Sequence, residues 1–336
     1  MNMSEVKQLE LFDEEQRKED ISTINQLFRD VKRYRKGSEF QKRLEFYSKF
    51  PYLGVYNAEL VAQQRPGARF VLTAKKWAEL YNRKIKPNAR PLIILVPFYP
   101  VDFLFDVIDT RPIDFKKNVD ENVAIERMIA KYNSAYLRGA GYYMDNLWVN
   151  IQKQGIYFMR YDAGSELNAE IRTDQSELLY VQVYKDVELP HHNYFTIGIN
   201  SNANMAEELS RIFHELGHLF CNHFTCQWWK GRQCTHTEKE FEAETVSYLV
   251  CNRLGIPTES IEYLSNYLDN SGLIPEISAE HIFKAVDTIQ SMAMGYMSVT
   301  DCLLYKYDKE FKTKVDIERE RRKKEREREK AMRPSI

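Results

Sequence analysis

The sequence predicts an α+β fold in which an N-terminal unit and a larger second unit are followed by a charged helix. Short apolar runs bounded by Gly, Pro, Asn and Asp alternate with segments of helical periodicity, as expected for mixed strands and helices. The strongest such periodicity lies near residue 212, and the C-terminal segment consists mainly of Lys, Arg and Glu. We expect an accessory domain over residues 1–115, a second domain over 116–300 and a helical tail over 301–336.

The composition limits the functional classes. The 336 residues include 48 Lys and Arg and 49 Asp and Glu, so the formal net charge is -1 and the whole chain is not a strongly basic nucleic-acid-binding module. Residues 1–20 contain no apolar segment, and the longest apolar stretch, residues 91–100, is too short to span a bilayer. Five cysteines without regular spacing suit a reducing compartment. We therefore expect a cytoplasmic protein without a membrane partner.

The N-terminal unit is expected to begin with one or two helices over residues 5–50. Basic residues between positions 29 and 43 cluster around Tyr34. Such a run usually forms a solvated helix face, and a nucleic-acid contact is the alternative.

A small α+β arrangement is expected after residue 50. A helix that carries Trp77 lies between segments with strand character, and we place Trp77 in the core. The expected strands are residues 70–72, 92–98 and 103–108.

The most specific motif of the chain is His-Glu-Leu-Gly-His at residues 214–218. It lies in an amphipathic helix over residues 204–221, with one buried apolar stripe. Asn204 with Glu207 three residues later fits an N-terminal cap of this helix.

The spacing within this motif suits a metal-activated hydrolase. His214 and His218 lie one helical turn apart and can point at one ion. Glu215 leaves the helix at another angle and can reach a water on that ion without binding the ion itself. These are the two imidazole ligands and the general base of His-Glu-x-x-His zinc hydrolases.

A catalytic zinc ion needs a third protein ligand and one open position for water. Residues 235–254 read as a second helix that stops at Gly255, and Glu240 and Glu244 share one of its faces. We expect Glu240 to be the third protein ligand of the zinc ion. We expect Glu244 to orient a ligand histidine without binding the zinc itself. Glu244 as the third ligand is the alternative.

Two capping boxes compete at the start of this second helix. Thr237 with Glu240 matches one of them. Thr235 with Glu238 matches the same pattern two residues earlier, and this choice leaves Glu240 free to bind metal.

The order of elements around the two motifs resembles that of a minimal zincin-like metallopeptidase domain. Residues 120–137 read as a helix that ends at the glycines near residue 140, and short strands follow at 156–161, 178–184 and 194–199. We expect the strand at 194–200 to form the edge of the cleft, where an extended peptide can pair with it. A plain core strand is the alternative.

Other residues of this region carry weaker signals. The Cys and His residues between the two motifs match no compact zinc knuckle, so we expect no second zinc site; they are Cys221, His223, Cys226, Cys234 and His236. Trp228 and Trp229 are expected to pack on the helices or to cover the rim of the cleft. His191 and His192 are expected in a turn near the cleft, where they either assist catalysis or have no role.

The sequence from His214 to His218, followed by Glu240-Phe-Glu-Ala-Glu244 on the next helix, resembles the ImmA/IrrE-type zinc metallopeptidases. It is also similar to ArdC-type antirestriction proteins, in which a Glu-x-x-Ala-Glu run leads to a Leu-Gly-Ile like that at 254–256. Short upstream fragments around Tyr56, Gln64, Trp77, Lys84 and Pro91 match the ArdC-type N-terminal domain in order and spacing, so the resemblance spans about residues 45–290.

The resemblance implies single-stranded DNA binding by the N-terminal unit. Aromatic stacking and a basic groove would be the means of binding. The basic residues that would line this groove are Arg83, Lys84, Lys86 and Arg90.

We expect a zinc-dependent endopeptidase that acts on a regulatory or DNA-binding protein, which the resemblance suggests is a repressor of a mobile element or stress response. The alternative is an ArdC-like antirestriction protein that binds single-stranded DNA and in which the zinc domain is secondary. A scaffold without chemistry is disfavoured, because a structural zinc site does not need Glu215. The oxyanion also needs a second donor besides the metal, and Tyr194, Arg211 and Tyr248 are the candidates.

Overall fold

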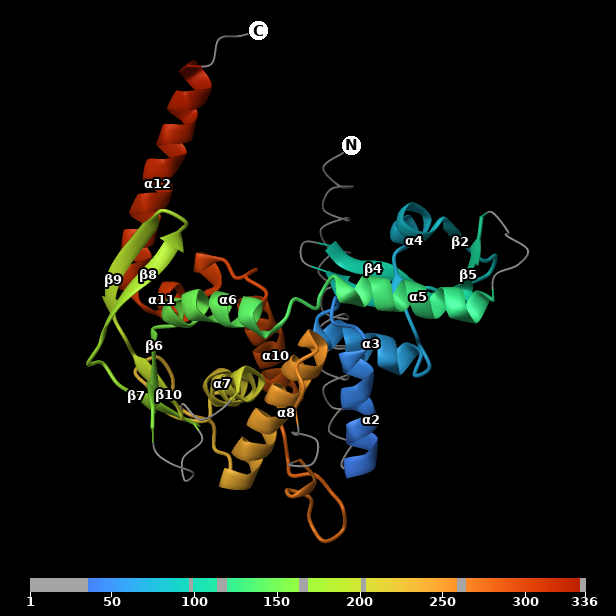
Figure 1. Cartoon of the computed structure of the whole chain (residues 1–336), viewed down its shortest axis with the longest axis horizontal. Coiled ribbons are helices and arrows are strands. Elements are labelled where there is room, and N and C mark those ends of the chain that lie inside the picture. Colours follow the sequence, from blue (N-terminus) through green and yellow to red (C-terminus); the bar gives the residue numbers. More distant parts are fainter. Residues whose placement is uncertain are drawn as a thin grey trace, which may run out of the picture.

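The computed structural model of the protein describes residues 36–96, 99–113, 120–162, 169–200, 204–258 and 264–332. Helices group around several small sheets, which confirms the α+β prediction (Figure 1). Most of the basic cluster around Tyr34 lies outside the described residues. The sequence also predicts a helix at residues 260–268, and the first part of it lies outside the described residues.

The first part of the described chain combines helices with two small antiparallel sheets. Its elements are α2 (Gly37–Ser48), α3 (Val55–Gln64), β1 (Val71–Leu72), α4 (Ala74–Tyr81), β2 (Arg83–Ile85), β3 (Leu92–Val96), β4 (Tyr99–Asp106), η1 (Val107–Asp109), β5 (Thr110–Pro112) and α5 (Glu121–Ser134). Strand β4 lies between β1 and β3, and β2 pairs with β5. Trp77 is 0% exposed and its indole N–H donates to the Phe105 carbonyl at 2.8 Å, so its predicted place in the core is confirmed.

The second part of the chain carries the two motif helices. Its elements are α6 (Ala140–Lys153), β6 (Ile156–Tyr161), β7 (Ala169–Thr173), β8 (Leu178–Tyr184), β9 (Val187–His192), β10 (Phe195–Asn200), α7 (Met205–Phe220), α8 (His236–Leu254), α10 (Ala279–Ala293), η2 (Val299–Asp301), α11 (Leu303–Tyr307) and α12 (Lys309–Met332). Strands β8 and β9 form a hairpin, and β6, β10 and β7 form a separate sheet. Helices α7 and α8 pack against each other beside this sheet (Figure 1).

The prediction that residues 194–200 form the edge of the cleft is wrong. Strand β10 is the central strand of its sheet, parallel to β6 and antiparallel to β7, and all six of its residues are buried. Its uninterrupted apolar character reflects burial between two strands rather than one exposed edge. The edge strand that lies next to α7 is β7, in which Ile171 pairs with Ile197 of β10.

The first two helices share a core with the motif helices. The rings of Phe40 in α2 and Phe241 in α8 lie 5.5 Å apart. Arg253, which is 1% exposed, reaches from α8 and donates to the Tyr47 carbonyl at 3.0 Å. Gln290 of α10 donates to the Pro51 carbonyl at 2.7 Å. Helix α2 thus supports α8 directly, and the segment that leads into α3 contacts α10. The domain boundary at residue 115 stays a prediction.

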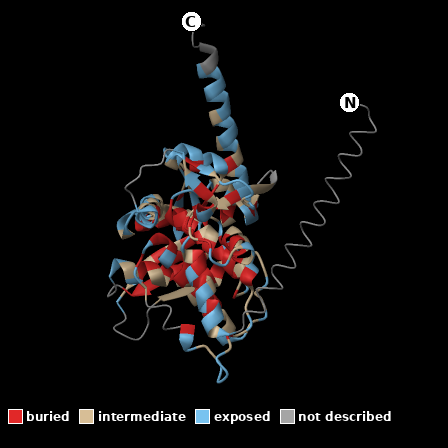
Figure 2. Cartoon of the chain, turned by 90° about the vertical axis from the view of Figure 1, so that its right-hand side faces the viewer, coloured by how far each residue is buried: buried red, intermediate tan, exposed pale blue. Residues whose placement is uncertain are grey.

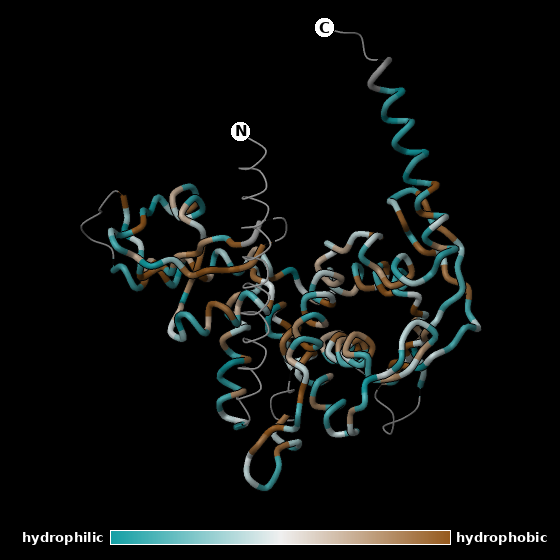
Figure 3. Tube along the Cα trace, turned by 180° about the vertical axis from the view of Figure 1, so that it is seen from behind, coloured by the Kyte–Doolittle hydropathy of each residue, from teal (hydrophilic) through white to brown (hydrophobic). Residues whose placement is uncertain are grey.

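Helix α12 begins on the β8–β9 hairpin and then extends into solvent. The Arg322 guanidinium lies 4.2 Å from the centre of the Tyr184 ring and also pairs with Asp186. Residues 323–329, beyond this contact, are exposed and hydrophilic (Figures 2 and 3). The helix also forms i, i+4 ion pairs such as Arg321–Glu325 at 2.6 Å. Within the described part of the chain, no helix combines the length and the apolar character needed to cross a bilayer.

Candidate metal centre

Helix α7 is fixed at its start and on its buried face. The Asn204 side chain accepts from the amide of Glu207, and the Glu207 carboxylate accepts from the Asn204 amide, so the predicted cap is confirmed as a capping box. Leu209, Ile212 and Leu216 are fully buried. The turn that carries His214 and His218 therefore stands on a rigid support.

Gly217 allows α7 and α8 to approach closely. A Cβ atom at this position would lie 3.1 Å from the Cα and 3.2 Å from the carbonyl oxygen of Ala243 in α8. These are backbone atoms that cannot turn aside. The glycine inside the His-Glu-Leu-Gly-His motif thus permits the crossing that brings Glu240 to the two histidines.

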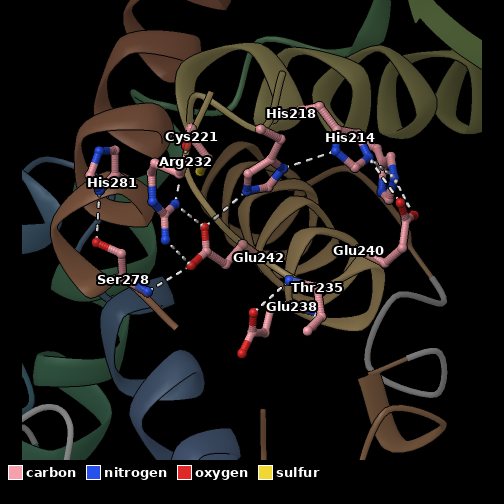
Figure 4. Close-up of polar contacts among 11 residues, drawn as sticks. His214, His218, Cys221, Arg232, Thr235, Glu238, Glu240, Glu242, Ser278 and His281 are labelled. Atoms are coloured by element: carbon pink, nitrogen blue, oxygen red, sulfur yellow. Dashed lines mark hydrogen bonds and ion pairs between the residues drawn. The ribbon is translucent and has the colours of Figure 1, made fainter. Parts of the chain in front are cut away.

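Helix α8 presents Glu240 because another residue caps the helix. The Thr235 side chain accepts from the Glu238 amide and the Glu238 carboxylate accepts from the Thr235 amide, so the earlier of the two predicted capping boxes forms. Gly255, with φ of 67°, ends the helix as expected. Glu240 remains free to face α7 (Figure 4).

Three donor atoms from the two helices converge on one point. His214 Nε2 and His218 Nε2 are 3.0 Å apart, and the Glu240 carboxylate oxygens lie 3.4 Å from the first and 3.5 Å from the second. Ligands about 2.1 Å from a tetrahedral zinc ion are separated by about 3.4 Å. The separations and the two-nitrogen, one-oxygen donor set therefore fit a zinc site, and all three side chains keep some exposure to solvent.

Glu244 lies behind the donors rather than among them. Its Oε2 is 3.0 Å from His214 Nδ1, the ring nitrogen opposite the one that faces Glu240. A carboxylate in this place fixes the orientation and tautomer of a ligand histidine. The geometry therefore favours Glu240 over Glu244 as the third ligand.

Glu215 is held beside the edge strand β7. It is 7% exposed, and burial raises the pKa of its carboxyl group to about 7. The nearby His214 lowers this pKa, the charge of Glu240 raises it, and a hydrogen bond from the Ile171 amide lowers it. A carboxyl group that titrates near neutral pH suits proton transfer.

A second group of possible ligands lies deeper in the fold. Cys221, His223 and Glu242 are all buried and close together. The Glu242 carboxylate, however, binds both arms of the Arg232 guanidinium, at 2.6 and 2.9 Å. Because a cation there would meet the positive charge of Arg232, we assign no metal to this group.

Tyr161 is a candidate site residue that the sequence did not indicate. Its ring covers Gly198, where a Cβ atom would lie 2.7 Å from Tyr161 Cε1. Its buried hydroxyl has no hydrogen-bond partner among the described residues. Burial raises the pKa of Tyr161, as do the charges of Glu170 and Glu215, so the phenol stays protonated close to the general base. Only the pairing of β6 with β10 reveals this position, and no sequence pattern encodes it.

Two of the expected oxyanion donors, Tyr194 and Tyr248, make contacts elsewhere in the fold. The same is true of His191 and Trp228. The Tyr194 hydroxyl donates to Asp308 at the start of α12, and Tyr248 is 6% exposed within the core. His191 lies 3.3 Å from the same Asp308 carboxylate. Trp228 packs edge-on against Tyr194 with ring centres 4.4 Å apart and stacks on Tyr307 of α11 at 5.7 Å.

Comparisons of the chain with protein-family models, with curated proteins and with solved structures return no match. The chemistry of the site therefore carries the functional proposal.

Proposed function

We propose that the protein is a zinc-dependent endopeptidase whose metal is held by His214, His218 and Glu240. The observation that carries the proposal is the convergence of these three donors at tetrahedral spacing beside the buried carboxyl group of Glu215. A site that only stabilises the fold needs no such carboxyl group. Zinc bound here would polarise a scissile carbonyl and lower the pKa of a water molecule.

The residues of the chain supply the proton transfer. Glu215 takes a proton from the attacking water and delivers it to the leaving amine, and its buried position beside His214 and Glu240 suits both steps. Tyr161 offers its unpartnered hydroxyl as the second donor to the developing oxyanion. Glu244 keeps the His214 ring in place during the reaction.

The edge strand β7 makes an extended polypeptide the fitting substrate. Among the described residues, β7 has a strand neighbour on one side only, and its Ile171 amide donates to Glu215. A peptide that pairs with the free side of β7 passes beside the general base. We propose a regulatory or DNA-binding protein as the natural substrate, in keeping with the family resemblance.

The second candidate function is single-stranded DNA binding by the N-terminal part in the manner of ArdC-type proteins. One of the basic residues expected to line the groove is engaged inside the protein, because Arg83 is 3% exposed. Trp77 is fully buried and so cannot stack on a base. The Arg83 guanidinium bonds to Thr110 and pairs with Glu121 at 2.8 Å. Lys84 and Arg90 are exposed and remain accessible to phosphate. We therefore place this function second.

Substitution of the general base tests the proposal. Glu215→Gln should retain zinc and the fold but lose peptide hydrolysis by roughly 10² to 10⁴, because an amide cannot accept the proton. Cleavage of a diverse peptide library, followed by mass spectrometry, measures this loss. Glu207→Gln is the matched control on the same helix, since a capping box accepts glutamine at that position. Equal cleavage by Glu215→Gln and the wild type would rule out this mechanism.

A further inference from the structure

A continuous line of buried polar side chains runs from His218 away from the metal centre. His218 Nδ1 lies 2.9 Å from His223 Nδ1, and His223 Nε2 lies 3.0 Å from Glu242 Oε2. Arg232 binds the Glu242 carboxylate through both arms, and the Ser278 amide donates to Glu242 at 2.6 Å (Figure 4). His223 is 2% exposed and Glu242 is 0% exposed.

The turn after α7 brings His223 into this line. The His223 amide donates to the His218 carbonyl at 3.0 Å, and Asn222 adopts a left-handed conformation with φ of 57°. The Arg232 amide donates to the Asn222 carbonyl at 2.8 Å, which closes the loop. Gly231 permits this closure, because a Cβ atom there would lie 2.8 Å from the backbone carbon of Phe224.

Only one arrangement of protons satisfies the whole line when His218 binds metal. His218 Nε2 faces the other two ligands and must keep its lone pair, so the proton of His218 is on Nδ1. This proton needs an acceptor, and His223 Nδ1 must therefore be unprotonated. The proton of His223 is then on Nε2, where it donates to the Glu242 carboxylate. The opposite tautomer of His223 would place two N–H groups against each other and a lone pair against a carboxylate.

We propose that His223 and Glu242 are positioning residues that fix the tautomer and the ring orientation of His218 and thereby strengthen metal binding. This inference rests on the proposed metal centre. The two ligand histidines are then supported in different ways: His214 donates directly to Glu244, and His218 donates to a carboxylate through one intervening imidazole. Arg232 and the Ser278 amide keep Glu242 in place and balance its charge.

The tautomers can be observed directly. Long-range ¹H–¹⁵N correlation spectra of the zinc-loaded full chain, labelled with ¹⁵N-histidine, distinguish Nδ1–H from Nε2–H rings. We expect His223 to carry its proton on Nε2 and His218 to carry its proton on Nδ1. A His223 ring protonated on Nδ1 would overturn the proposal. The experiment uses the unaltered protein and so does not depend on the folding of a variant.

A pair of substitutions separates hydrogen bonding from packing. His223→Phe keeps a buried ring but leaves the His218 N–H and Glu242 without partners, and we expect the dissociation constant for zinc to rise by about 10- to 100-fold. His223→Gln offers an amide oxygen to His218 and an amide N–H to Glu242, so its affinity should stay close to that of the wild type. His192→Phe, at an exposed position of β9, is the control and should not change the affinity.

Competition with a chromophoric zinc chelator gives the dissociation constants, and circular dichroism reports the fold of each variant. Wild-type affinity in a folded His223→Phe variant would overturn the proposal, as would a His223→Gln variant that binds as weakly as His223→Phe. A wild-type protein that binds no zinc would contradict the metal centre itself, so the two failures are distinguishable.

Discussion

Two imidazoles on one helix face have different electrostatic surroundings. Burial lowers the pKa of His214, but hydrogen bonds to Glu240 and Glu244 outweigh it and raise this pKa to about 10. Burial and the charge of His214 lower the pKa of His218 to about 3. The hydrogen bond to His214 lowers the pKa of Glu240 to about 2. At neutral pH and without metal, His214 therefore carries a second ring proton and is an imidazolium, whereas His218 is neutral and Glu240 is ionised.

Zinc affinity should depend on pH because of this proton. A zinc ligand must be a neutral imidazole, so zinc competes with the proton of His214 at every pH below about 10. We expect affinity to rise about tenfold per pH unit from about pH 7 to 9, with release of one proton. Zinc titration calorimetry in buffers of different ionisation enthalpy measures the proton release. An affinity that is independent of pH over this range would show that His214 is neutral before zinc binds.

The sequence can predict only those site residues that the regular spacing of a helix brings together. His214, Glu215 and His218 share one helix, and the capping pattern of Thr235 with Glu238 indicated that Glu240 is free. His223 could not be placed, because its position depends on the left-handed turn after α7.

Among the elements, the strands expected at 156–161 and 178–184 coincide with β6 and β8, whereas strand β7 and helix α6 are not expected from the sequence. The segment 194–200 is apolar throughout, and this pattern fits a central strand as well as an edge. Strand β7 was missed because Glu170 and Arg172 give it a polar character. Gly139 and Gly141 favour the end of the preceding helix, but Gly139 is in fact the N-cap of α6, which the sequence pattern therefore conceals.

The close approach of α7 and α8 at Gly217 can be tested by substitution. Gly217→Ala places a methyl group against the Ala243 backbone, and we expect a loss of about 1–3 kcal/mol in the free energy of unfolding, together with weaker zinc binding. Chemical denaturation monitored by circular dichroism measures the first effect. Gly141→Ala in α6 is the matched control, because its Cβ would meet nothing within 4 Å, and it should be neutral or stabilising. Equal stability of the two variants would refute the close-approach argument.

At the scale of the whole molecule, the N-terminal helices are part of the support of the metal centre. Arg253 of α8 donates to the Tyr47 carbonyl, and Gln290 of α10 donates to the Pro51 carbonyl. The sequence could not predict these contacts, because they join residues that are more than 200 positions apart in the chain.

The second candidate function, single-stranded DNA binding, gives a prediction for the whole chain. With Trp77 and Arg83 buried, we expect the full-length protein to bind single-stranded DNA weakly. Each phosphate contact contributes about -0.7 to the log–log dependence of affinity on salt, so a few contacts give a shallow slope. Titration of a labelled oligonucleotide at two salt concentrations measures the slope. Tight binding that persists in Glu215→Gln would favour the DNA-protecting function instead.

The zinc content of dialysed protein shows whether His214, His218 and Glu240 hold the metal. We predict about one zinc per chain in the wild type and in Glu238→Gln, whose capping box tolerates glutamine. His218→Ala and Glu240→Ala should lose most of the metal, and Glu244→Ala should lose less than Glu240→Ala because Glu244 contacts only the back of His214. Undiminished zinc in His218→Ala, or a greater loss in Glu244→Ala than in Glu240→Ala, would contradict the account.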